Sequence, residues 1–63
     1  MIQITRLDDS ELMINSDMIE FIEQTPDTII TLSDGKKILT KLSPEEIINR
    51  IVEFRQRVLQ PIT

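Results

Sequence analysis

The chain has 63 residues, no cysteine, no histidine and a formal net charge of −4. A chain of this length forms one small domain and buries only about 60% of the surface that its unfolded state exposes. The missing residue types exclude disulfides, thiol nucleophiles, imidazole bases and zinc sites built on cysteine or histidine. Hydrophobic residues make up 40% of the chain and charged residues 29%, which is typical of a globular protein. We expect one domain, residues 1–63, that is not an enzyme and uses no metal or cofactor.

The sequence predicts a protein without a membrane span. No apolar run approaches the roughly 18 to 20 residues that a spanning helix needs. The first residues, MIQITRLDD, lack the basic and then apolar order of a signal peptide. We therefore expect a cytoplasmic location.

Short strands are predicted in the first half of the chain, where apolar and polar residues alternate. Residues 2–5 and about 11–14 form two of them, joined by a turn at Asp8-Asp9-Ser10. Residues 18–24 are ambiguous, since their apolar spacing fits a strand or a short helical turn that Asp17 would cap. The segment is short for a helix, so we favour a strand.

The strongest strand signal comes from residues 28–32 and 37–41, which flank Ser33-Asp34-Gly35-Lys36. Asp-Gly is typical of a two-residue type I′ turn, whose register places Ile30 opposite Leu39. Both faces of this hairpin then carry aliphatic side chains, with Ile30, Leu32 and Leu39 on one and Ile29 and Ile38, beside Thr31 and Thr40, on the other. A barrel-like curl, a covering helix or a second subunit is expected to bury the extra face.

Residues 43–59 are predicted to form an amphipathic helix. Ser43 and Glu46 have the spacing of a capping box, Pro44 suits the first helical position, and Pro61 stops the helix. An apolar stripe at helical spacing follows from Ile47, Ile51, Phe54 and Val58. We predict an α+β fold in which an antiparallel meander of four or five short strands, residues 1–42, is covered by this single C-terminal helix.

Charge is divided unevenly along the chain. Residues 1–35 contain eight acidic and one basic residue, whereas residues 36–63 contain six basic and three acidic residues. The two parts are expected to attract each other within a subunit or between neighbours. The chain also contains twelve isoleucines, more than so small a core is expected to bury. Together, the charge division and the surplus of isoleucine predict a homo-oligomer whose candidate interface residues are Ile29, Ile38, Ile51, Phe54 and Val58.

The basic residues of the second part also allow an alternative function, a small nucleic-acid-binding or regulatory module. Lys36, Lys37, Lys41 and the helix arginines would then contact phosphates. The acidic net charge and the lack of tyrosine and tryptophan disfavour this alternative. Lysines on a hairpin more often prevent aggregation at a sheet edge.

The chain resembles the small flagellar proteins of the FlbD family, which include SwrD-like proteins. The resemblance spans about residues 1 to 55 and rests on TRLDDSE, on LMIN and on the run MIEFIEQTPDTIITLSDGKKI, in which IEQTPDT is the most specific part. This chain departs from the family pattern at two places. Family members commonly have asparagine and glycine in the first turn, where this chain has Asp8 and Asp9, and they commonly have an acidic residue at about the position of Leu42.

The resemblance implies a non-enzymatic accessory of bacterial flagellar motility that supports swarming by raising motor power through protein contacts. Its partners would be further copies of the chain and a component of the flagellar motor or basal body, with no small-molecule substrate. The motor at the membrane is a candidate place of association. Motif positions that we single out as interaction or structural residues are Arg6, Glu23, Pro26, Asp27, Lys36 and Lys37. Arg6 and Glu23 both adjoin turns, so we predict a salt bridge between them across the sheet.

Overall fold

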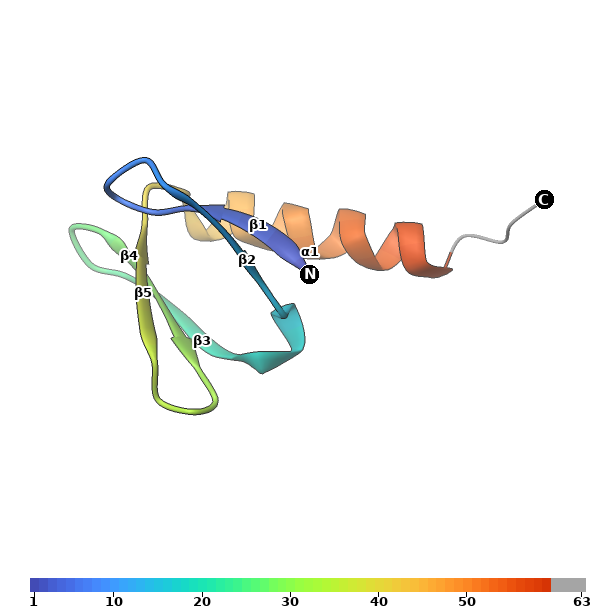
Figure 1. Ribbon diagram of the computed structural model, residues 1–63, viewed down its shortest axis with the longest axis horizontal. Helices are drawn as coiled ribbons and strands as arrows, with labels where there is room; N and C mark the ends of the chain where they lie inside the picture. Colours follow the sequence, from blue (N-terminus) through green and yellow to red (C-terminus); the bar gives the residue numbers. More distant parts are fainter. Residues whose placement is uncertain (60–63) are drawn as a thin grey trace.

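A computed structural model describes residues 1–59 of the chain. Pro61, the predicted stop of the helix, and the rest of residues 60–63 lie outside the described part. The elements follow the order β1 (Ile2–Thr5), β2 (Glu11–Ile14), the 3₁₀ turn η1 (Ser16–Met18), β3 (Ile19–Gln24), β4 (Thr28–Leu32), β5 (Lys37–Thr40) and α1 (Pro44–Leu59). These antiparallel strands followed by one C-terminal helix confirm the predicted α+β fold (Figure 1).

The strands divide into two antiparallel sheets. β1 and β2 form a hairpin in which Ile4 lies opposite Leu12, and β3, β4 and β5 form a three-stranded meander. An isolated antiparallel bridge between Arg6 and Thr40 joins the loop end of β1 to β5. The β region is therefore two small sheets that meet at one corner rather than one continuous meander.

The ambiguous segment, residues 18–24, forms a strand over nearly its whole length, as we favoured. Residues Ser16–Met18 form a short 3₁₀ turn, and the favoured strand follows from Ile19. The side chain of Asn15 caps the turn by accepting a hydrogen bond of 3.0 Å from the N–H of Asp17. Asp17, the predicted cap, is thus a residue of the turn, and its carboxylate is free to contact the helix.

The predicted register of the second hairpin is wrong by one residue. Ile30 lies opposite Ile38 and Ile29 opposite Leu39, because the loop has three residues rather than two. The N–H of Leu32 donates to the carbonyl of Lys36 at 2.8 Å, and Gly35 is the one residue of this loop with a positive φ, of 90°. A type I′ turn needs positive φ at two successive residues, whereas a three-residue loop needs it at one.

This register divides the aliphatic residues between the two faces of the sheet. Ile30 and Ile38 point together into the core, whereas Ile29 and Leu39 lie on the outer face, since successive side chains alternate. The predicted grouping of Ile29 with Ile38 on one face is therefore also wrong.

The core lies between the two sheets and the first half of α1. It consists of buried aliphatic side chains from both hairpins and from the entry to the helix: Ile2, Ile4, Ile14, Ile30, Ile38, Leu42 and Ile47. Ile51 and Phe54 on α1 are partly buried against it. The second half of the helix extends past the sheets (Figure 1).

Side-chain hydrogen bonds of Thr40 and Ser43 fix the connection between β5 and α1. Thr40 is almost fully buried and its hydroxyl donates to the carbonyl of Thr5 at 2.6 Å and accepts from the N–H of Leu42 at 3.1 Å. Ser43 then caps α1, since its hydroxyl accepts from the N–H of Glu46 at 3.1 Å. The chain therefore passes from β5 into the helix through a connection in which the Thr40 and Ser43 side chains bind backbone groups.

Candidate interaction surfaces

Four of the motif residues singled out in the sequence, Arg6, Glu23, Pro26 and Asp27, do not lie at one place on the surface. Arg6 directly follows β1 at the start of the first hairpin loop, and its Nε donates to the hydroxyl of Ser10 at 2.9 Å. Glu23 lies in β3, and Pro26 and Asp27 belong to the exposed bend between β3 and β4. The predicted salt bridge between Arg6 and Glu23 is wrong, because Arg6 is drawn into its own loop rather than across the sheet.

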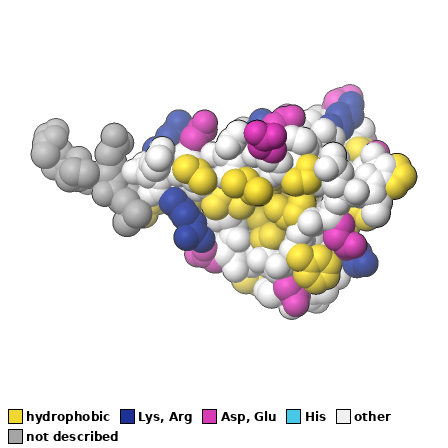
Figure 2. All heavy atoms as spheres, turned by 180° about the vertical axis from the view of Figure 1, so that it is seen from behind, with side chains coloured by type: hydrophobic (Ala, Val, Ile, Leu, Met, Phe, Trp, Pro, Cys, Tyr) yellow, Lys and Arg dark blue, Asp and Glu magenta, His cyan; other side chains and the backbone are white. Residues whose placement is uncertain are grey.

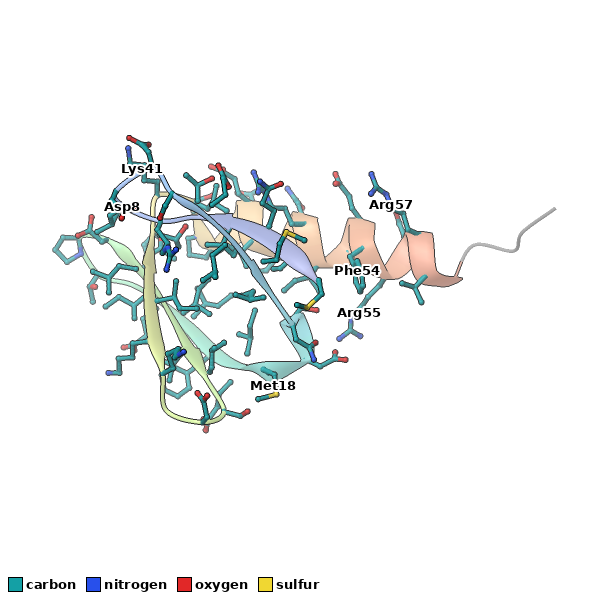
Figure 3. The ribbon with its side chains drawn as sticks, viewed as in Figure 1. Asp8, Met18, Lys41, Phe54, Arg55 and Arg57 are labelled. Atoms are coloured by element: carbon teal, nitrogen blue, oxygen red, sulfur yellow. The ribbon has the colours of Figure 1, made fainter. Side chains whose placement is uncertain are left out.

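Two ion pairs connect the acidic first part of the chain with its basic second part. Lys41 contacts Asp9 at 2.6 Å, and Arg55 contacts Asp17 at 3.2 Å. Figure 3 shows Lys41 beside the first hairpin loop and Arg55 and Arg57 pointing to opposite sides of the helix. All four paired side chains are largely exposed, so each pair contributes at most about 1 kcal/mol. The pairs also occupy two of the cations that a nucleic-acid surface would need.

The carboxyl group of Asp8 is held in its ionised form by the same loop. The hydroxyl of Ser10, first, and the N–H of Ser10 both donate to it, and these hydrogen bonds lower the pKa of Asp8 from its ordinary value of 3.8. The neighbouring guanidinium of Arg6 acts in the same direction. Asp8 is fully exposed, which suits a turn-forming residue better than an acid-base catalyst.

The five predicted interface residues do not form one surface. Ile38 is 6% exposed and belongs to the core, so that assignment is wrong: the corrected register turns its side chain inward. Ile29 lies on the outer face of the sheet, and the three helix residues lie on the opposite side of the core. Ile51 and Phe54 are half-buried, whereas Val58 is 65% exposed.

The helix side of the molecule carries a row of accessible apolar side chains. Figure 2 shows this row beginning near the C-terminal end of the chain and continuing along α1. Ile48, Val52 and Val58 are each about half exposed or more. Val58 and Phe54 also line a shallow groove of about 260 Å³ against the η1 turn, beside the pair of Arg55 and Asp17.

The outer face of the larger sheet carries a second apolar area. Phe21 and Leu39 are 47% and 43% exposed, and Ile29, directly opposite Leu39, is half-buried. Thr31 lies on this face opposite Phe21 and is nevertheless buried, and its hydroxyl has no hydrogen-bond partner within residues 1–59. This buried, unpaired hydroxyl is a feature that the sequence pattern did not reveal.

A third surface, which we call the β5 groove, lies between the edge of β5 and the first hairpin. It has a volume of about 590 Å³ and is lined by Arg6, Leu7, Asp8, Leu12, Lys36, Lys37, Ile38 and Leu39. Three of the predicted motif residues, Arg6, Lys36 and Lys37, are thereby brought together. Their proximity depends on the corner between the two sheets, and the only sequence signal for it was the shared placement of the three residues next to turns.

Residues 1–59 contain neither a cluster of metal-ligating side chains nor a helix that could cross a membrane. Across residues 1–59, acidic side chains do not gather in a group of three or more that would hold a metal. The helix α1 is neither long nor apolar enough to cross a membrane.

Comparison with known proteins identifies one family. A family model described as flagellar and swarming motility proteins, FlbD, matches residues 1–59. No curated protein and no solved structure matches the chain.

Proposed function

Because the chain belongs to the FlbD family of flagellar and swarming motility proteins, we propose that it is a non-enzymatic accessory, similar to SwrD, that raises flagellar motor power through protein contacts. The observation that carries this proposal is the amount of apolar surface left accessible on so small a body. Large hydrophobic side chains at least 38% exposed occur on both sides of the molecule: Met1, Leu7, Met13, Met18, Phe21, Leu39, Ile48, Val52 and Val58. The helix row of Ile48, Val52 and Val58 is the part of this surface that we assign to protein-protein contacts, since neighbouring accessible apolar side chains are typical of such sites.

We also propose that the chain acts in the cytoplasm, next to a motor or basal-body component, and that it associates with further copies of itself. The helix side supports self-association, since the protruding half of α1 presents Val58 next to the half-buried Phe54. Ile51, by contrast, packs on the core, so its replacement would disturb the fold as well as any interface.

Swarming of a strain that lacks the gene tests the proposed function. We expect loss of swarming in the deletion strain, with flagella still assembled, and recovery when the wild-type chain is supplied. Torque of tethered cells should fall in parallel, since the proposal concerns motor power. A deletion strain that swarms normally would contradict it.

The Val58→Asp variant tests the helix surface, because a carboxylate at this exposed site leaves the core intact. Light scattering of the wild type should give at least two chains per particle, and the variant should give one. Gln56→Asp, on an exposed site of the same helix, is the matched control and should keep the wild-type mass. A wild-type chain that is monomeric at micromolar concentration would contradict self-association.

A further inference from the structure

The β5 strand has one edge that the rest of the described chain leaves open. The carbonyl of Lys36 accepts from Leu32, so the backbone groups of residues 36, 38 and 40 point toward β4. In an antiparallel ladder the alternate residues then point away from it. The N–H of Lys41 does so, since it donates to the carbonyl of Thr5 at 3.1 Å.

β1 covers this edge only at its end. It bridges β5 at Arg6 and Thr40 and then turns away into its loop. The N–H and C=O of Lys37 and the N–H of Leu39 therefore face the β5 groove, and within residues 1–59 no strand pairs with them. An edge of this kind is a template for an added strand.

The charge of the groove favours an acidic occupant. Its lining contains three basic residues and one acidic residue on a chain whose net charge is −4. Asp8, the acidic one, is bound to Ser10 in the hairpin loop. Lys36 and Lys37 have no ion-pair partner within residues 1–59, so both are available to incoming carboxylates.

The apolar lining favours alternating side chains. Leu7 and Leu39 are 38% and 43% exposed and Leu12 is half-buried, so apolar residues of an added strand would find aliphatic contacts along the groove. A second copy of β5 fits poorly, because its lysines would approach the lysines already present.

We propose that the β5 groove binds an extended segment of a partner protein in which acidic and apolar residues alternate, and that this segment adds a strand to β5. The inference rests on the proposed function, since it specifies the kind of partner through which such an accessory acts. Main-chain hydrogen bonds to Lys37 and Leu39 hold the segment, and its carboxylates, which share one face of the added strand, contact Lys37.

Nuclear magnetic resonance titration of the ¹⁵N-labelled chain tests the binding. The probe is an eight-residue peptide of alternating glutamate and valine with blocked ends, and the control peptide has lysine in place of glutamate. The largest amide shifts are expected at Lys37 and Leu39, with at least tenfold weaker binding of the lysine peptide. Shifts that are absent, or equal for the two peptides, would overturn the proposal.

Two variants, with one charge-matched control, separate the contribution of charge from that of backbone pairing. Lys37→Glu should weaken binding about three- to tenfold, because one exposed ion pair is replaced by repulsion. Arg57→Glu makes the same charge change at the far end of α1 and should alter affinity less than twofold. Leu39→Pro removes the outward N–H without touching the bonds to β4, and should weaken binding about tenfold. Unchanged affinity in Lys37→Glu and Leu39→Pro, with folding verified by circular dichroism, would overturn the proposal.

Other occupants are distinguished in the same assay. A single-stranded oligonucleotide that binds at these lysines more tightly than the acidic peptide would overturn the proposal in favour of a nucleic acid. Self-association that Lys37→Glu abolishes would overturn it in favour of a second copy.

Complementation separates this inference from the proposed function. If the deletion strain swarms poorly and Lys37→Glu restores swarming as well as the wild type does, the groove assignment fails while the motility function stands. If the deletion strain swarms normally, the motility function fails, and peptide binding is judged from the titration alone.

Discussion

The loops of the two β-hairpins, residues 6–10 and 32–36, share their backbone hydrogen bonds but differ at the one residue with positive φ. In each, the N–H of the first residue donates to the carbonyl of the fifth, at 2.9 and 2.8 Å, and the N–H of the fourth donates to the carbonyl of the first, at 3.0 and 2.9 Å. The fourth residue is Asp9 in one loop, with φ of 70°, and Gly35 in the other, with φ of 90°.

The third residue of each loop is an aspartate whose carboxylate accepts a backbone hydrogen bond. Asp8 and Asp34 each accept a hydrogen bond from the N–H two residues later, at 3.0 and 2.9 Å. Asp9 is moreover tied to Lys41 across the corner of the two sheets, whereas a Cβ added at Gly35 would meet no heavy atom within 4 Å. One loop thus combines local and tertiary stabilisation, and the other depends on the conformational freedom of glycine.

The largest expected effect comes from breaking the contact between the two hairpins. Thr40→Val removes the acceptor of the Leu42 N–H and the donor to Thr5, and should lower the free energy of unfolding by about 1 to 3 kcal/mol. Urea denaturation measures the change.

Thr31→Val is the matched control for that variant on the same hairpin. It replaces a buried hydroxyl that has no partner in residues 1–59, so stability should rise, by about 1 kcal/mol. Equal effects of the two substitutions would contradict the assigned hydrogen bonds.

Exchanging the loop residues has an intermediate effect. Gly35→Ala should cost about 1 kcal/mol of stability, because alanine is strained at positive φ although space is available. Gly35→Asp copies the first loop and should cost less, since aspartate tolerates this conformation better. Thermal unfolding ranks the variants, and Gly35→Ala at wild-type stability would contradict the conformational argument.

The smallest effect concerns pH and only the first loop. Because the pKa of Asp8 is lowered by folding, its hydrogen bonds add stability above the ordinary value of 3.8, and this stability is lost as the pH falls through the folded pKa. Ser10→Ala removes the first cause of the shift. The difference in melting temperature between wild type and this variant should therefore shrink between neutral and strongly acidic pH, and a constant difference would contradict the assignment.

The register of the second hairpin shows where sequence reasoning reached its limit. Asp34-Gly35 correctly placed a turn, but two-residue and three-residue loops share this dipeptide, and the choice between them moves Ile38 from one face to the other. The predicted salt bridge between Arg6 and Glu23 was wrong for a related reason, since proximity to turns does not specify which partner a long side chain contacts. The cap of the short 3₁₀ turn is Asn15 rather than the predicted Asp17, because the identity of the cap depends on where the turn begins.

Local patterns by themselves determined the strands, the capped C-terminal helix and the α+β class, because alternation, turn residues and the capping box act over a few neighbouring residues. The sequence also singled out Arg6, Lys36 and Lys37 as motif positions. The comparison with known families places the chain among flagellar and swarming motility proteins. Only the tertiary structure decided that the strands form two sheets and that these three cations line one groove. Both outcomes depend on the corner at Thr40, where a single side chain bonds residues 35 positions apart in the chain.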